Sequence, residues 1–208
     1  MTIALAPSTP VRDYTWLLAE IASWLHRADL EDKIPTFVLL AESRIYRELK
    51  VRAMEEPLSG TTADGVLVLP SDYVNLKYIR ISGKRPIERR TADWIYDNRP
   101  DLTGEPRYCA REGETLIFAP EPGEDTALVG MYYKRLPALS LDNATNWFTE
   151  NAIGLLIYGA LTEAAPFLAN DERIVVWQTK YTELRDQVQN EERGEQFSGS
   201  PLTIQVKR

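Results

Sequence analysis

Residues 147–168 read WFTENAIGLLIYGALTEAAPFL and are apolar at nearly every position from Ile153 to Ala164. A helix that is apolar around its whole circumference is stable only when other elements cover it on all sides. We therefore expect one helix over Trp147–Leu168, lying at the centre of a helix bundle. Pro166 should end or kink this helix near Ala165, because the residue before a proline avoids the helical conformation.

The segment that follows predicts a second, longer helix. Asn170 is a good N-cap, and the carboxylates of Asp171 and Glu172 favour the positive end of the helix dipole. The helix is expected to reach about Gln196, with an apolar stripe whose members recur three and four positions apart. The stripe consists of Ile174, Trp177, Tyr181, Leu184 and Val188.

Two shorter helices are predicted near the start of the chain, over Tyr14–Leu25 and Ile34–Leu49. Asp13 can cap the first, and Pro35 suits the first turn of the second because its missing amide would have no helical partner there. The short connection His26–Lys33 predicts an antiparallel hairpin. Because each helix pair alone would leave an apolar stripe exposed, the N- and C-terminal pairs are expected to close into a four-helix bundle.

The pattern changes from about Met54, where glycine and proline begin to recur between short β-rich runs. Such spacing is typical of an antiparallel sandwich or small barrel. A short helix over Thr91–Asn98, capped by Thr91, is expected across one end, and Glu121–Asp125 is interpreted as a hairpin connection. The predicted strands are Val66–Leu69, Val74–Ser82, Pro86–Arg90, Arg107–Arg111, Thr115–Phe118 and Ala127–Lys134.

These patterns predict an α+β fold with an inserted domain. Residues 1–53 and 137–197 would supply the two helix pairs of the bundle, and residues 54–136 the antiparallel β-domain. Residues 198–208 are expected to form an extended C-terminal arm in which Leu202, Ile204 and Val206 alternate with other residues. A lone strand of this kind is a liability in a free monomer, so we expect it to pair with a sheet or groove on a partner.

The composition excludes several kinds of site. Cys109 and His26 are the only residues of their types, so neither an intramolecular disulfide nor a zinc site of Cys and His ligands can form within the chain. We predict no metal and no organic cofactor. No apolar run approaches the roughly 20 residues that span a bilayer, and Met1–Pro10 lacks the features of a secretory signal. We expect a soluble protein made in a reducing cytoplasm.

The charge balance bears on nucleic-acid binding. With 24 basic and 31 acidic residues the formal net charge is −7. Tight binding to duplex DNA needs clustered basic side chains against the phosphates, so this balance disfavours it.

Motifs for phosphate loops, dinucleotide binding, zinc proteases and serine hydrolases do not occur in the sequence, and we predict that the protein is not an enzyme. Carboxylate pairs are the one catalytic route left open, with Glu42, Glu48 and Glu163 as candidates by residue type only. These acids are expected instead to be solvated or to pair with Arg44 or Arg173 inside the bundle.

A different class of function, a carbohydrate-binding or glycan-hydrolysing tail component, would depend on exposed aromatic rings. Most tryptophans, however, sit on predicted helices at core spacing, which favours core or interface anchoring. His26 is expected at the C-terminal end of the first helix, and Cys109 in the core as a small apolar residue. The tryptophans are Trp16, Trp24, Trp94, Trp147 and Trp177.

Charge is unevenly distributed along the β-domain. Residues 77–90 carry six basic side chains and one acidic one, whereas residues 101–126 carry seven acidic and two basic ones. These are either two solvated faces or complementary patches that meet between neighbouring copies, a heterologous contact of the kind that closes rings. The inter-subunit candidates are Arg80, Lys84, Arg85, Arg89, Arg90, Glu112 and Glu114.

Packing motifs occur along most of the chain, the longest being Leu156–Leu161 and Glu163–Leu168. The others are Trp24-Leu25, Ile34-Pro35, Ala41-Glu42, Pro106–Tyr108, Leu116–Pro120, Tyr132–Lys134, Leu136–Leu139, Thr145–Trp147, Asp171–Arg173 and Trp177. From about Tyr14 to Ser200 the chain thereby resembles the head-to-tail adaptor (connector) proteins of tailed bacteriophages, in particular of short-tailed phages. Cys109 departs from the family pattern, in which an aromatic or aliphatic residue is commoner.

The resemblance implies a structural virion protein of the phage neck, assembled in the host cytoplasm and without membrane contact. Such adaptors form a dodecameric ring that docks on the portal protein and carries the tail nozzle or tail tube protein beneath it. The ring continues the channel through which the genome DNA passes, and net-negative protomers would let phosphates slide without sequence-specific binding. Family members often engage the portal through helical parts and an extended C-terminus, here the arm with Leu202, Ile204 and Val206.

One further alternative stays open beside the ring. The protein could complete the portal without forming a ring of its own. In either case the isolated chain is expected to be monomeric.

Overall fold

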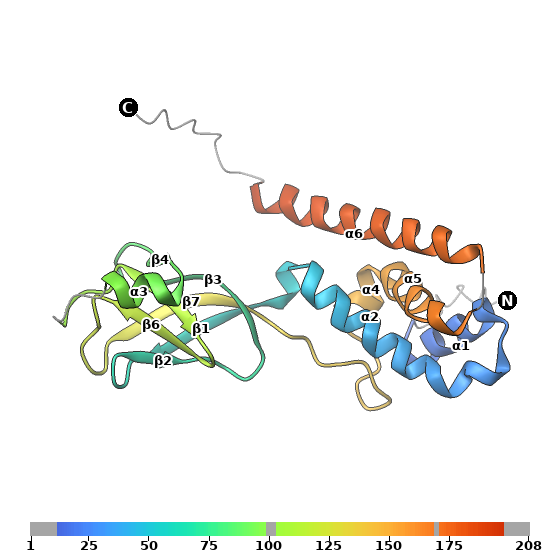
Figure 1. Cartoon of the computed structure of the whole chain (residues 1–208), viewed down its shortest axis with the longest axis horizontal. Helices are drawn as coiled ribbons and strands as arrows, with labels where there is room; N and C mark the ends of the chain where they lie inside the picture. The colour runs from blue at the N-terminus through green and yellow to red at the C-terminus, as the bar shows by residue number, and fades with distance from the viewer. Residues whose placement is uncertain (1–11, 99–102, 169–170, 198–208) are drawn as a thin grey trace, which may run out of the picture. The chain divides into compact units, whose positions relative to one another are not determined.

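The computed structural model describes residues 12–98, 103–168 and 171–197, which fall into two compact units (Figure 1). The helical unit combines the chain up to Val51 with the chain from Pro137 onward, and the β unit spans Arg52–Leu136. The predicted α+β class is confirmed, since the described residues form six α-helices and two sheets. A closed four-helix bundle and an inserted sandwich stay predictions.

The most apolar helix, α5, lies among the other helices of its unit, as its apolar circumference predicts. Leu155, Leu156, Ala160 and Leu161 are all fully buried. Because these residues leave no polar side, α5 is stable only in such an enclosed position. The helices that contact α5 (Ile153–Glu163) are α1 (Tyr14–Leu25), α2 (Ile34–Glu48), α4 (Trp147–Asn151) and α6 (Arg173–Phe197).

The single helix expected over residues 147–168 is wrong, because the chain breaks at Ala152 into α4 and α5. Asn146 caps α4 through a reciprocal pair of hydrogen bonds with Thr149, and the buried Phe148 packs its ring edge-on against Tyr46. This packing redirects the chain where local propensity alone would continue the helix. Helix α5 ends at Glu163, close to Ala165 as predicted, and Pro166 lies in a 3-10 turn.

Most of the predicted helix starts are confirmed. The Asp13 carboxylate accepts a hydrogen bond of 2.8 Å from the Trp16 amide, and Pro35 occupies the first turn of α2. The Asp171 carboxylate accepts one of 3.0 Å from the Arg173 amide at the start of α6, while the predicted cap Asn170 lies outside the described residues.

The connection between α1 and α2 differs from the prediction. It is a 3-10 helix, Ala28–Lys33, where a short turn was expected, and α2 packs more extensively on α5 than on α1. Both α1 and α2 therefore pack on α5, and they pack against each other only to a small extent.

Two sheets make up the β unit, one with strand order β1-β7-β3 and the other with β2-β6-β5-β4. The expectation of purely antiparallel pairing is wrong at one place, because β4 and β5 run parallel. The segment Glu121–Asp125 is not a hairpin connection, since it joins β6 of one sheet to β7 of the other. The strands are β1 (Glu55–Thr61), β2 (Val66–Val68), β3 (Tyr73–Ile81), β4 (Glu88–Arg89), β5 (Tyr108–Glu112), β6 (Thr115–Ala119) and β7 (Ala127–Lys134).

Strand β1 is not among the predicted strands. Its sequence, EEPLSGT, combines residues that are rare in strands, and Pro57 cannot donate to a central ladder. Because β1 pairs only with β7 at the edge of its sheet, Pro57 is tolerated there. Pairing with β7 sets the register that buries Leu58, so the sequence of β1 alone does not predict it.

The core of the β unit draws on both sheets. Leu58 and Leu128 come from one sheet, and Leu67 and Phe118 from the other. On the second sheet, helix α3 (Ala92–Asn98) adds Ile95 to a smaller buried cluster, and Thr91 caps this helix as predicted.

Candidate functional site

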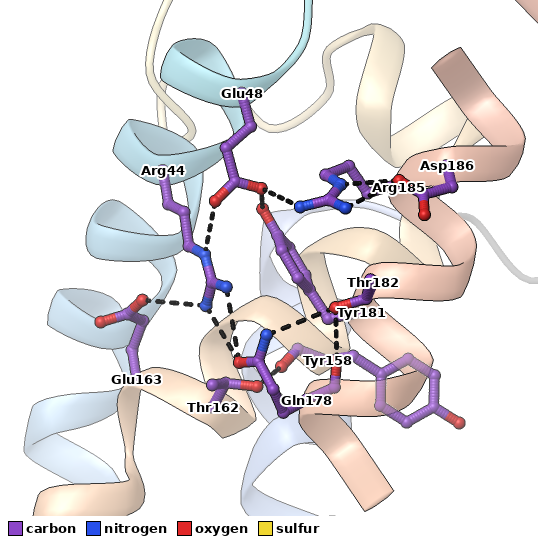
Figure 2. A network of polar contacts seen from close by, with 10 residues as sticks. All are labelled: Arg44, Glu48, Tyr158, Thr162, Glu163, Gln178, Tyr181, Thr182, Arg185 and Asp186. Carbon is purple, nitrogen blue, oxygen red and sulfur yellow. Dashed lines mark hydrogen bonds and ion pairs between the residues drawn. The ribbon is translucent and has the colours of Figure 1, made fainter. Parts of the chain in front are cut away.

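The helical unit holds a polar network in which Arg44 of α2 is the hub (Figure 2). Its Nε donates to Glu48 Oε1 at 3.0 Å, and its Nη1 lies 3.7 Å from Glu163 Oε1. Both Nη atoms approach Gln178 Oε1 at 3.4 Å, and the guanidinium lies 4.1 Å from the centroid of the Tyr181 ring. One side chain therefore ties α2 to α5 and α6.

Glu48 completes the connection between α2 and α6. Its Oε2 accepts a hydrogen bond of 2.9 Å from the Tyr181 hydroxyl and lies 3.5 Å from Arg185 Nη1. Burial alone would raise the pKa of Glu48, but the hydrogen bonds from Arg44 and Tyr181 and the two arginine charges hold this pKa below its usual value. Burial, together with the neighbouring Glu48, raises the pKa of Tyr181 far above its usual value.

The carboxylates that are candidates for catalysis by residue type all have structural partners. Glu48 and Glu163 pair with Arg44, as the interpretation of a bundle ion pair predicts. Glu42 is buried and accepts hydrogen bonds from the Leu139 amide, at 3.3 and 3.2 Å, and from Asn146 Nδ2, at 3.1 Å. Burial raises the pKa of Glu42 despite these two donors. Its role here is to hold the segment before α4 against α2.

His26 and Cys109 also occupy the predicted structural positions. His26 is the exposed C-cap of α1, in the left-handed conformation with φ 52°. Cys109 is fully buried in β5, and burial raises the pKa of its thiol to about 11. A thiol of this kind is a poor nucleophile at neutral pH.

The basic candidates of the β unit lie on its surface, and several have acidic or polar partners within the chain. Lys84 pairs with Glu105 at 2.6 Å, and Arg90 with Glu88 at 2.8 Å. Arg89 donates to the Asn75 side chain at 2.9 Å. Arg80 and Arg85 are exposed as well.

The acidic candidates lie at the turn between β5 and β6. Glu112 accepts a hydrogen bond of 2.8 Å from the Tyr96 hydroxyl, and Glu114 is exposed. These local partners are compatible with a contact to a neighbouring subunit, because surface pairs of this kind are weak and can exchange one partner for another.

The fold brings Arg111 close to the adjacent pair Arg89 and Arg90, from which it is distant in the sequence. Arg89, Arg90 and Arg111 line a groove of about 290 Å³ whose floor includes Leu76 and Cys109. Sequence reasoning missed Arg111, since it sits among acidic residues along the chain. Only the pairing of β5 with β4 places it beside the other two.

A second group that sequence reasoning missed consists of apolar side chains exposed on the helical unit. Leu39 and Leu40 lie on the outside of α2, and Val175 and Val176 on the outside of α6. The sequence signal for these four residues is that each is apolar but lies outside the apolar stripe of its helix. Contiguous exposed apolar side chains mark interaction surfaces.

Comparison with protein-family models matches residues 12–205 to a family described as SU10 adaptor protein. The chain belongs to the SU10 adaptor protein family. The resemblance to phage head-to-tail adaptors is thereby confirmed, and the match includes both units. A search of curated proteins found no match to the chain.

Membership in the SU10 adaptor family has consequences at a coarse level. The family is structural and implies a component of the phage virion that interacts with portal and tail proteins. Within the described ranges, no helix has the length and apolar character needed to cross a bilayer, and no group of three or more potential metal ligands occurs.

The C-terminal arm and the tryptophans of this adaptor differ in how far the structure describes them. The arm residues Leu202, Ile204 and Val206 lie outside the described residues. Among the tryptophans only Trp177 is buried, and the other four are half-buried, so complete burial does not exclude sugar stacking. Nevertheless Trp24 packs against Tyr158 and Trp94 against Tyr108, which favours anchoring.

Proposed function

We propose that the chain is a head-to-tail adaptor that forms a dodecameric ring, docks on the portal and connects it to the tail nozzle. The observation that carries this proposal is the family match, which spans residues 12–205 and so includes both units. Subunits of a ring contact unlike surfaces on either side, and a rotation that closes makes the assembly finite.

The charge of the chain fits a conduit for DNA. A ring of subunits that each carry a formal net charge of −7 presents a field that repels phosphates. Strong binding would require many basic side chains at the wall, and it would slow the passage of the genome. The proposed channel therefore guides DNA without sequence-specific contacts.

Two sets of residues are proposed to make the ring and its docking contacts. In the β unit, the basic surface residues Arg80, Lys84, Arg85, Arg89 and Arg90 would face acidic residues of a neighbouring copy, including Glu112 and Glu114. Complementary patches of this kind fix the register of a contact more than they raise its affinity.

The arm is proposed to pair with the portal. Leu202, Ile204 and Val206 would add a strand to a sheet or groove, where main-chain hydrogen bonds supply affinity. Twelve weak arms acting together would hold the ring durably through their effective concentration.

Imaging of the assembled neck tests this function. Rotationally averaged cryo-electron microscopy of purified particles should show twelve copies between the portal and the tail nozzle. A chain truncated after Phe197 should still fold but should dock less well on the portal. Particles that lack the chain would contradict the proposal, and undiminished docking of the truncated chain would contradict the role of the arm.

The carbohydrate alternative and the ringless completion factor give different results in simple assays. Glycan binding by the isolated chain would favour the carbohydrate-binding component. A native mass that shows single copies bound around the portal, without contacts between copies, would favour the completion factor.

A further inference from the structure

The exposed faces of α2 and α6 carry the same arrangement of side chains. On α2, Leu39 and Leu40 are followed by Ser43 and then Arg47. On α6, Val175 and Val176 are followed by Thr179 and then Glu183, at the same spacings. Each face thus has an apolar pair, a small hydroxyl residue one turn later and a charged residue one further turn on, and the charges have opposite signs.

These residues point away from the core of the helical unit. The exposed fractions are 53% for Leu39 and 44% for Leu40, and 71% for Val175 and 57% for Val176. Buried neighbours on the opposite faces, such as Ala41 in α2 and Tyr181 in α6, hold both helices on the unit. Among residues 12–98, 103–168 and 171–197, nothing therefore covers these two apolar pairs on their outer faces.

Contacts within the chain fix how α2 and α6 run relative to each other. Arg44 contacts Gln178, 134 positions later, and Glu48 contacts Tyr181 and Arg185, 133 and 137 positions later. Contacts that advance together along both helices show that α2 and α6 run parallel, as Figure 1 also shows. Residues at the same height on the two helices therefore differ in number by about 135.

The outer faces match at almost the same offset. Leu39 and Val175, Leu40 and Val176, Ser43 and Thr179, and Arg47 and Glu183 each differ by 136 positions. Cyclic symmetry moves a subunit by rotation without translation along the axis. Where the helices run along that axis, the α2 of a neighbouring copy meets α6 in the parallel direction and at the offset that the chain already uses.

We propose that the outer face of α6 in one copy packs against the outer face of α2 in the next, with the leucines against the valines and Arg47 against Glu183. This interface rests on the proposed ring and deepens it by naming the surfaces. A second copy of this chain is the favoured occupant, because the two faces match each other in apolar positions, in height along the helices and in charge. Glu183 pairs with Lys180 in the single chain at 2.8 Å, an exposed pair that can share the carboxylate with Arg47.

A contact between two different faces is heterologous, so it can repeat around a ring. A face that packed in parallel against its own copy would instead place Arg47 beside Arg47 or Glu183 beside Glu183. Like charges in an interface are unfavourable, and this disfavours a parallel isologous dimer.

Disulfide cross-linking between two variants, each with one added cysteine besides the buried Cys109, tests the contact and its direction. Adaptor-deficient phage is complemented with full-length Ser43→Cys and Thr179→Cys chains of different mass, and purified particles are oxidised. The mixed dimer should dominate, while particles made with either variant alone should give none. Asp186→Cys is the matched control in place of Thr179→Cys, since seven helical residues move the thiol by about 10 Å, beyond the roughly 7 Å between Cα atoms that a disulfide tolerates.

Charge reversal supplies a second readout that does not depend on cysteine chemistry. Arg47→Glu and Glu183→Arg should each lower incorporation into particles by about tenfold or more, and the two changes combined in one chain should restore it. Glu191→Arg is the control on α6, because the offset of 136 places Glu191 beyond the end of α2 at Glu48.

The outcomes separate this interface from the function on which it rests. Particles with an adaptor ring, but with no mixed cross-link or with same-variant dimers as the main product, would overturn the interface and leave the function standing. Failure of the double charge reversal to restore incorporation would also count against the interface. Particles that contain no copy of the chain would overturn both.

Discussion

Replacement of Arg44 by methionine removes the hub of the network between α2, α5 and α6 while keeping most of the side-chain volume. Arg44 is 19% exposed and makes a hydrogen bond of 3.0 Å to Glu48 and a cation–π contact of 4.1 Å with Tyr181. A charge-assisted hydrogen bond contributes about 1.5–3 kcal/mol and a cation–π contact about 1 kcal/mol. Because Glu48 keeps Tyr181 and Arg185 as partners, part of this loss is offset.

We therefore expect Arg44→Met to lower the free energy of unfolding of the helical unit by about 2–3 kcal/mol. Combined with Glu48→Gln, the two losses should fall short of additivity by about 1–2 kcal/mol, since both changes break the same pair. Arg47→Met is the matched control on α2. Arg47 is exposed, so the control should change the stability of the isolated chain by less than about 0.5 kcal/mol.

Urea unfolding followed by the helical circular dichroism signal measures these changes, because the described helices lie mainly in this unit. The pKa of Glu48 is lowered in the folded chain, so its contribution is present above the unfolded value of 4.5 and is lost as the pH falls through the folded value. The difference between wild type and Arg44→Met should accordingly shrink towards pH 3. A loss equal to that of the Arg47 control, or fully additive double mutants, would refute the network as an anchor of α6.

Three further predictions concern single residues. Burial raises the pKa of Glu42, so the contribution of this carboxyl group to stability is largest below the unfolded pKa of 4.5 and declines as the pH rises through the folded pKa. In thermal melts, the stability of Glu42→Gln relative to wild type should therefore increase between pH 4 and pH 8. Gly130→Ala should destabilise the β unit by about 3 kcal/mol, because a Cβ would lie 2.3 Å from the Tyr78 carbonyl oxygen; Gly104→Ala, with 3.4 Å to its nearest neighbour, should be mild in the same denaturation assay. A thiol reagent should label Cys109 in urea but at least about 100-fold more slowly in the native chain at pH 8, since its thiol pKa is raised to about 11, and fast native labelling would contradict its burial.

The sequence alone determined the elements whose signals are local. Asp13, Pro35 and Thr91 mark helix starts that the structure confirms, because a cap or a missing amide acts within one turn of its own residue. The apolar circumference of α5 likewise fixed its enclosed position. The family resemblance also rested on the sequence alone, since its packing motifs are short stretches of neighbouring residues.

Part of the candidate site was also within reach of sequence reasoning. Arg44 and Glu48 stand four apart on one helix, and Glu163 interrupts an apolar helix, so a bundle ion pair could be predicted. The roles of Gln178 and Tyr181 could not, because more than 130 positions separate them from α2. Nor could the grouping of Arg111 with Arg89, which depends on the parallel pairing of β4 with β5.

Only the tertiary structure decided the remaining features. The break at Ala152 follows from the packing of Phe148, and β1 is a strand because β7 lies beside it, although its own residues disfavour one. The parallel alignment of α2 and α6, in which residues about 135 positions apart lie side by side, likewise results from contacts between distant segments. The physical reason is the same in each case: a cap or an apolar stripe is a property of neighbouring residues, whereas register, breaks and shared surfaces depend on which distant segment supplies the partner atoms.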